Sequence, residues 1–260
     1  MAKAAEHPLQ EAANKASLCT SGKVRPHILR RFDRDLENLE QHILDMGGAA
    51  LQQLVMVNQA LLTMDEALAS QVMADDQSVD DLETLVDEEC VSLLIHHQPV
   101  ADDLRTVVCS LRSAHHLERI GDYAGNIAER VRTICQHPPS PLINPVVAMG
   151  RLATQQLHSL LEAYRRKDGD LALVVRNQDV EVDACNNEAF QSIMAHMMLS
   201  PQDVPCCVHL LFVARNYERL CDHITDVAEN IHYLAHGTHM ASPRPKADMT
   251  RTYLPGFPSE

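Results

Sequence analysis

The stretch HHLERIGDYAGNIAERV, residues 115–131, recurs in outline one hundred positions later as RNYERLCDHITDVAENI, residues 215–231. Both contain the skeleton E-R-x-x-D-x-x-x-x-x-A-E. On a helix, residues four apart lie about 40° apart around the axis, so the acidic residues of each copy share one face. Carboxylates at this spacing repel one another, which makes their recurrence informative. The acidic residues are Glu118, Asp122 and Glu129 in the first copy and Glu218, Asp222, Asp226 and Glu229 in the second.

The composition of the chain favours helices over strands. Its 260 residues include only nine Gly and 3% aromatic residues, whereas Leu, Ala, Val, Met, Glu and Gln are abundant. Because strands favour aromatic and β-branched side chains, the expected fold class is all-α. Proline residues mark the breaks between helices, since proline lacks an amide proton and clashes inside a helix.

Apolar residues at three- and four-residue spacing between these breaks predict six helices, and the Pro-rich linker 137–145 divides them into two sets of three. Together with the internal repeat, this predicts two tandem, pseudo-symmetric three-helix bundles at residues 24–136 and 146–236. The terminal segments 1–23 and 237–260 are expected to be flexible. The predicted helices span about residues 26–64, 65–95, 102–136, 146–166, 170–198 and 204–236.

Charge and cysteine usage restrict the class of protein. The formal net charge of −14 disfavours nucleic acid as a partner, because phosphate binding needs concentrated Lys and Arg. Eight Cys occur without a C-x-x-C pair, so we expect reduced thiols, with Cys206, Cys207 and Cys221 packed in the core. No stretch resembles a signal-peptide core or reaches the roughly eighteen apolar residues of a membrane span. The expected location is the cytoplasm.

A second acidic face is predicted on the second helix of the first half, and it could meet the face on the third. Several carboxylates would then lie together with few cations near them, and a hard cation such as Mg²⁺, Ca²⁺, Mn²⁺ or iron would relieve their repulsion. His115 stands one turn before Glu118 on the same face. The alternative is a solvated surface on which Arg119 and Arg219 pair with neighbouring carboxylates. Solvation does not require the pattern to recur, so the repeat favours a site. The second-helix residues are Asp76, Asp80, Glu83 and Asp87.

Three stretches resemble the PhoU family of phosphate-uptake regulators. DMGGAA, residues 45–50, is similar to the M-G-G of the family's first helix. VDEECVSLLIHHQPVADDLR, residues 86–105, contains its Q-P-x-x-x-D-L-R turn, and LERIGDYAGNIAE, residues 117–129, resembles its third-helix signature. The resemblance extends over about residues 27–236. The turn and the E-R-I-G-D element, found together in the right order, are highly specific.

The resemblance implies two three-helix bundles, with an E/D-x-x-x-D motif on two helices of each that can hold a multinuclear metal cluster of iron, zinc, manganese or magnesium. In the second bundle one motif reads Asn177 and Glu181, and Asn offers a carbonyl oxygen but no charge. We therefore expect the first bundle to bind cations at least as tightly as the second. The predicted metal ligands are Asp76, Asp80, Glu118, Asp122, Glu181, Glu218, Asp222 and Asp226.

The resemblance also implies a function. The chain is expected to be a non-catalytic, cytoplasmic accessory protein that represses phosphate-starvation signalling. Its implied partners are the ATPase subunit of the Pst phosphate transporter and a phosphate-sensing histidine kinase, and it is expected to form a homodimer.

Two other classes remain open. A carboxylate-bridged di-iron enzyme also holds metal inside a helical bundle, but it needs two E-x-x-H motifs. Glu229 and His232 supply one, whereas the matching pair in the first half is Glu129 and Arg132. A purely structural helical adaptor without metal needs none of these residues.

Overall fold

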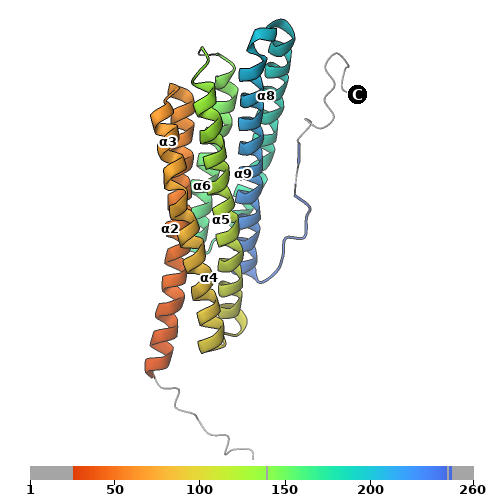
Figure 1. The fold of residues 1–260 in the computed structure, drawn as a ribbon. Coiled ribbons are helices and arrows are strands. Elements are labelled where there is room, and N and C mark those ends of the chain that lie inside the picture. The colour runs from red at the N-terminus through yellow and green to blue at the C-terminus, as the bar shows by residue number, and fades with distance from the viewer. Residues whose placement is uncertain (1–25, 139, 245, 248–260) are drawn as a thin grey trace, which may run out of the picture.

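The computed structural model describes residues 26–138, 140–244 and 246–247. Within these residues the chain is helical and contains no strand, which confirms the all-α fold class (Figure 1). The predicted segment 1–23 and the last part of the predicted tail, residues 248–260, lie outside the described residues. Among the described helices, none is long and apolar enough to cross a membrane.

The first bundle consists of a long first helix, a second helix in two pieces and a long third helix. Asp65 starts the second helix, because its side chain accepts a hydrogen bond of 3.0 Å from the amide of Leu68. The same helix ends where Gln98 adopts a left-handed backbone before Pro99. The helices are α2 (Pro26–Thr63), α3 (Glu66–Asp75), α4 (Gln77–His97) and α5 (Ala101–Ile134).

The second bundle repeats this plan. The Asp168 side chain accepts hydrogen bonds from the amides of Asp170 and Leu171. It therefore caps the second helix of this bundle as Asp65 caps that of the first. Gly237 follows the last helix in a left-handed backbone with φ +71°. The helices are α6 (Ile143–Arg166), α7 (Gly169–Asn177), α8 (Asp179–Leu199), the short 3₁₀ helix η2 (Pro201–Asp203) and α9 (Val204–His236).

Two details of the sequence-based prediction were wrong. The second helix of each bundle was expected to be continuous, but it breaks at Asp76 in the first bundle and at Gln178 in the second. The linker was expected to reach residue 145, but α6 already begins at Ile143. Pro145 lies in its first turn, where a missing amide proton costs no hydrogen bond.

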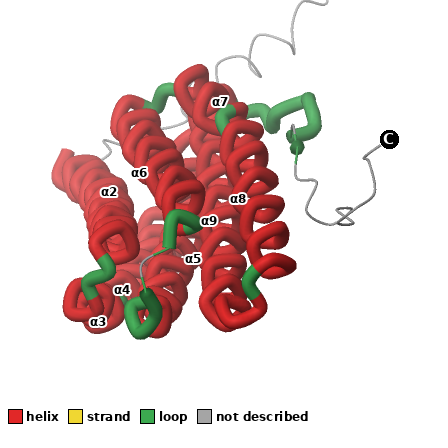
Figure 2. The backbone as a smooth tube through the Cα atoms, turned by 90° about the horizontal axis from the view of Figure 1, so that it is seen from above, coloured by secondary structure: helices red, strands yellow, loops and turns green. Residues whose placement is uncertain are grey.

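The two bundles lie side by side and share one core. Helices α5 and α9 pack against each other in the middle, and α2 packs against α6 beside them (Figures 1 and 2). Buried apolar side chains from both bundles form a single continuous cluster. Ser110 on α5 and Tyr164 on α6 are buried, and their hydroxyls lie 3.1 Å apart across the boundary. The bundles are therefore joined through their interior.

Two glycines allow α2 and α6 to approach closely. A Cβ on Gly47 of α2 would overlap Leu161 of α6, and a Cβ on Gly150 of α6 would overlap Asn58 of α2. Each glycine follows a fully buried methionine, Met46 in one bundle and Met149 in the other. This recurring Met-Gly pair is a second mark of the internal repeat.

Candidate metal centre

The acidic residues predicted for the first bundle converge where α4 packs against α5. Ligand atoms of Asp80, Glu118 and Asp122 all lie within 4.8 Å of one another. Ligand atoms of Glu83, His115 and Glu118 form a second group within the same distance. Because Glu118 belongs to both groups, they form one row of carboxylates that ends at an imidazole.

Asp76 joins this row from the break between α3 and α4. A Cβ built on Gly125 of α5 would lie 3.4 Å from Asp76 Oδ2, so the α5 backbone runs close to the carboxylate. Burial raises the pKa of Asp76, and the negative charges of Asp122 and Asp80 raise it further. We call these residues the first acidic cluster: Asp76, Asp80, Glu83, His115, Glu118 and Asp122.

Glu118 is the electrostatically strained member of the first acidic cluster. Its side chain is only 12% exposed, and among the described residues its buried Oε2 atom accepts no hydrogen bond, although the Nε of Arg119 lies nearby. Burial and then the charge of Asp122 raise the pKa of Glu118 to about 7. Arg119 opposes this shift, with Nε 3.3 Å from Glu118 and Nη1 2.8 Å from Asp122, but its side chain is 45% exposed. One half-exposed guanidinium leaves the cluster with excess negative charge.

The donor set of the first acidic cluster fits a hard divalent cation. Mg²⁺, Mn²⁺ and iron take carboxylate oxygens, and adjacent carboxylates can bridge two ions. His115 adds an imidazole, which suits manganese, iron or zinc better than magnesium. A cation here would offset the burial and the charge of Asp122, which together raise the pKa of Glu118. The structure thus brings together Asp76, Asp80, Glu118 and Asp122 as expected, and their role as metal ligands stays a prediction.

The second bundle presents a different acidic pair from the one expected. Asn177 ends α7 and Glu181 lies on α8, and both side chains are exposed. Asp179 and Asp183 are buried instead, with 4% and 3% of their surface exposed. Asp179 and Asp183 themselves have the D-x-x-x-D spacing, so the motif was present but was placed two residues too early. Asp179, rather than Glu181, shares a contact partner with Asp222.

An arginine from beyond α9 links two of these acids, Asp179 and Asp222. Arg244 Nη2 lies 2.8 Å from Asp179 Oδ1 and 2.6 Å from Asp222 Oδ1. We call Asp179, Asp183 and Asp222 the second acidic cluster. Glu218, expected to belong to it, is 5% exposed and pairs with Arg215 at 2.9 Å. The second acidic cluster therefore already contains a positive charge.

Asp226 lies at the junction of the two bundles, together with two histidines that the sequence analysis did not single out. Ligand atoms of His116 on α5 and of His223 and Asp226 on α9 lie within 4.8 Å of one another. The two Nδ1 atoms are 3.0 Å apart. Burial, followed by the neighbouring His223, lowers the pKa of His116 to about 4, so its ring is neutral near pH 7. Their proximity depends on the packing of α5 on α9, which spacing along the sequence does not reveal.

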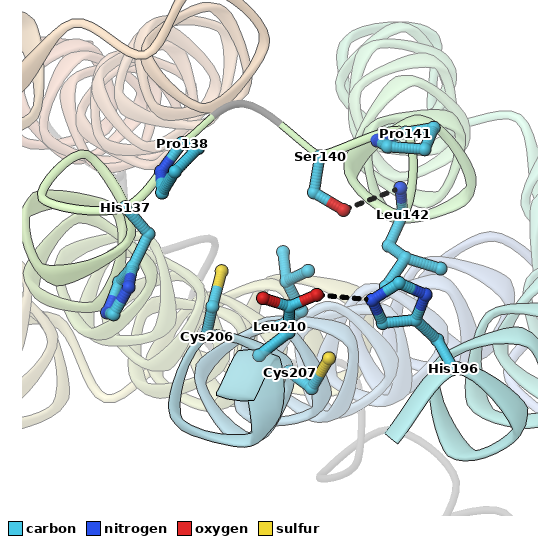
Figure 3. A pocket seen from close by; sticks show the side chains of 10 residues that line it. His137, Pro138, Ser140, Pro141, Leu142, His196, Cys206, Cys207 and Leu210 are labelled. Carbon is cyan, nitrogen blue, oxygen red and sulfur yellow. Dashed lines mark hydrogen bonds and ion pairs between the residues drawn. The ribbon is translucent and has the colours of Figure 1, made fainter. Parts of the chain in front are cut away.

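A cavity of about 190 Å³ lies at the linker, where the bundles meet at the other end (Figure 3). Cys206 and Cys207 line it but are themselves 7% and 1% exposed, which confirms the expected core packing. Burial raises the pKa of both thiols, so they stay protonated near pH 7. His196 and Asp203 pair across the wall at 2.8 Å. Neither cysteine of the described cavity wall is therefore expected to be a reactive thiolate.

The di-iron alternative finds little support in the described contacts. Glu229, the carboxylate of its E-x-x-H motif, lies 2.8 Å from the Nε of Arg176. In the first bundle Arg132, at the position of the missing histidine, pairs with Glu66 at 3.6 Å. In the first bundle, the position where a di-iron site would need a histidine ligand is therefore occupied by Arg132.

Fold and acidic clusters together define a class of protein: an all-helical molecule of two pseudo-symmetric three-helix bundles, with carboxylates between the second and third helix of each. The PhoU domain family matches this chain twice, at residues 43–131 and 146–231. The chain belongs to the PhoU family.

Several relatives resemble the chain over most of its length. A protein of Rhizobium meliloti named "Phosphate-specific transport system accessory protein PhoU homolog" is 38% identical over 87% of this chain and 96% of its own. A protein of the same name from Caulobacter vibrioides is 36% identical over 86% of this chain and 97% of its own. The crystal structure of PhoU from Pseudomonas aeruginosa superposes with a TM-score of 0.77 at 35% identity, over 80% of this chain and 100% of that one.

Proposed function

We propose that this chain is an accessory protein of a phosphate-specific transport system that represses phosphate-starvation signalling when phosphate is plentiful. The observation that carries the proposal is the extent of the likeness. Relatives with that accessory role in their names match through both bundles, over 96% of one relative's length. In this proposal the chain acts by binding other proteins and has no catalytic role.

The partners in this proposal are the ATPase subunit of the transporter and a phosphate-sensing histidine kinase, bound at the cytoplasmic side of the membrane. Exposed apolar side chains on the outer part of α4 and the turn after it support docking. Val91 is 54% exposed, Ile95 66% and Val100 73%. Such side chains gain free energy when a partner covers them, and a second copy of the chain in a homodimer could cover part of the same surface.

In this proposal, a cation in the first acidic cluster stabilises the docking surface. Asp76, Asp80 and Glu83 belong to the second helix of the bundle, whereas Glu118 and Asp122 belong to the third. A divalent ion shared by these carboxylates would neutralise their repulsion and hold α4 against α5. Iron, zinc, manganese and magnesium are the candidate ions, since each accepts these donors.

A genetic experiment tests the regulatory role. Deletion of the gene should leave phosphate-starvation genes expressed in phosphate-rich medium, and restoring the chain should silence them. A deletion strain with a normal response, together with a purified chain that binds neither transporter nor kinase, would favour the structural-adaptor alternative.

A biochemical experiment tests whether the cluster supports docking. Asp80→Ala removes a carboxylate from the first acidic cluster, and Asp81→Ala removes its exposed neighbour on the same helix. Pull-down of the ATPase subunit should weaken with Asp80→Ala in the presence of Mn²⁺ and should not change with Asp81→Ala. Equal binding by both variants would separate docking from the cluster.

A further inference from the structure

The described chain beyond α9 turns back along the second bundle rather than leaving it (Figure 1). Gly237 makes the reversal with its left-handed backbone, and a Cβ there would lie 3.0 Å from the guanidinium of Arg105. The ring of His239 then stacks on Tyr233 of α9, with ring centres 4.3 Å apart and planes 2° from parallel. The segment is thus directed toward α7 and α8 before it reaches the acidic residues.

A buried arginine donates a hydrogen bond to the backbone of the returning segment. Arg176 on α7 is only 2% exposed, yet its Nη2 donates a 2.8 Å hydrogen bond to the carbonyl oxygen of Ser242. Its Nε binds Glu229 on α9 at 2.8 Å. A charged group at this depth needs partners for its donors, and the returning segment supplies one of them.

Arg244 then enters the second acidic cluster. Its side chain is 15% exposed, and it contacts Asp179 through two nitrogens, Nε at 3.0 Å and Nη2 at 2.8 Å. The Nε atom donates a hydrogen bond to Asp179, and Nη2 adds an ion pair with the same carboxylate. The contact of Nη2 with Asp222 at 2.6 Å joins α8 to α9 through the same side chain.

The segment is also held at its far end by backbone contacts. The amide of Ala247 donates a 2.6 Å hydrogen bond to Asp183, and the carbonyl of Ala247 accepts one of 2.8 Å from Asn187. Lys246 Nζ lies 3.4 Å from Asp222. Side chains of α8 thus bind both polar groups of one peptide residue, a pattern typical of peptide recognition rather than of a loose tail.

We propose that the acidic groove between α8 and α9 is a binding site for a basic peptide segment, and that the described residues 242–244 and 246–247 of this chain are its internal ligand. The guanidinium of Arg244 occupies the place that a cation would take in the first bundle. The second acidic cluster therefore does not fit a metal cluster while the segment is bound, because a divalent ion next to Asp179 and Asp222 would meet the arginine. This inference goes beyond the transport-accessory role and does not depend on it.

Hydrogen–deuterium exchange of the full chain tests the docking. The amide of Ala247 should be protected in the wild type, and Arg244→Gln should speed its exchange by about tenfold or more, as expected when a charged hydrogen-bonded pair is lost. Arg31→Gln is the matched control, because the Arg31 side chain is 80% exposed. Unprotected exchange in the wild type, or equal protection in Arg244→Gln, would overturn the proposal. Unchanged exchange in α2 shows that each variant is folded.

A Mn²⁺ titration tests whether the guanidinium takes the place of a cation. Arg244→Gln should bind one more Mn²⁺ per chain than the wild type, and adding Asp222→Asn should abolish the gain. An ion bound in the first acidic cluster would be present in the wild type and in both variants, so it does not affect the difference in the number of Mn²⁺ ions bound per chain. No gain of Mn²⁺ in a variant whose segment is released would overturn the assignment of Arg244 to a cation site. Neither measurement involves phosphate signalling. The transport-accessory proposal is therefore tested separately, by the gene deletion described above.

Discussion

The two bundles repeat one backbone plan but neutralise their carboxylates differently. In the first bundle the positive charge comes from Arg119, which follows Glu118 directly in the sequence and is 45% exposed. In the second it comes from Arg244, which lies beyond the last helix and is 15% exposed. The repeated motif therefore collects negative charge in both bundles, but the pairing arginine belongs to the repeat itself in the first bundle and lies beyond it in the second.

The difference also separates the chemistry of the two bundles. The first acidic cluster has a raised pKa at Glu118, caused by burial and by the charge of Asp122. In the second acidic cluster, the guanidinium of Arg244 contacts Asp179 on α8 and Asp222 on α9. Within the described residues, a largely buried guanidinium pairs with the second acidic cluster, whereas the arginine of the first is half exposed, and the following predictions test this contrast.

The largest expected effect concerns metal affinity. Asp122→Ala removes a carboxylate of the first acidic cluster and should weaken Mn²⁺ binding at least ~100-fold, since even outer-shell changes cost about 10–100-fold. Asp222→Ala in the second bundle should change the affinity of the wild-type site by less than about threefold. Isothermal titration calorimetry measures both. Loss of binding in Asp222→Ala alone would reverse the proposed contrast.

The next effect concerns Gly47 and Gly150, the glycines that follow a buried methionine in the first and second bundle. Gly150→Ala should destabilise the protein by about 2–3 kcal/mol, because its Cβ would lie 2.7 Å from the hydroxyl of the buried Tyr217. Gly47→Ala should cost less, since the Leu161 side chain that it meets can rotate. Gly48→Ala meets nothing within 4 Å and should stabilise α2 by up to about 1 kcal/mol. Urea unfolding measures all three, and equal costs at Gly47 and Gly150 would contradict the asymmetry.

A smaller effect is expected on the free energy of unfolding when Arg244 and Arg119 are replaced in turn. Arg244→Gln should lower the free energy of unfolding by about 1–2 kcal/mol, because it leaves the buried Asp179 without the guanidinium that pairs with it. Arg119→Gln should cost less than about 1 kcal/mol, since solvent screens a pair whose arginine is half exposed. Chemical denaturation of both variants in a chelating buffer gives the comparison. A larger loss for Arg119→Gln would show that the first cluster depends more on its arginine.

The smallest effect is a pH dependence at Glu118. Its pKa is about 7 in the folded protein and 4.5 for an ordinary glutamate, so the folded state binds the proton more tightly than the unfolded state. Stability must then decrease as pH rises from about 4.5 to about 7. Glu118→Gln should therefore stabilise the metal-free protein at pH 8 by about 1 kcal/mol, and should have no effect at pH 4. A melting temperature difference that does not vary with pH would contradict the raised pKa.

The sequence predicted the helices well because their signals are local. Apolar spacing, the capping residues Asp65 and Asp168 and the prolines all act within a few residues of the feature they determine. The repeated acidic pattern likewise placed Glu118 and Asp122 on one face of the third helix, and the structure brings their ligand atoms together. The breaks at Asp76 and Gln178 were missed because neither carries a proline or a glycine.

What the sequence did not predict depends on contacts between distant segments. The motif was assigned to Asn177 and Glu181, although Asp179 and Asp183 have the D-x-x-x-D spacing, and only the packing of α8 on α9 distinguishes the two registers. Arg244 was missed because a polar, Pro-rich segment has no apolar periodicity that would indicate a binding site. Its described contacts come from the shape and charge of a groove made by other helices.

The continuous interior has a consequence for how the molecule melts. The Ser110–Tyr164 contact and the surrounding apolar side chains belong to both repeats at once, so unfolding one would leave the other with an exposed, incomplete interior. The two repeats should therefore unfold in a single cooperative transition. Whatever binds the native form of one repeat then raises the melting temperature of the whole chain, in proportion to RT ln(1 + [L]/Kd). An ion in the first bundle would thus also stabilise the groove that holds Arg244 in the second.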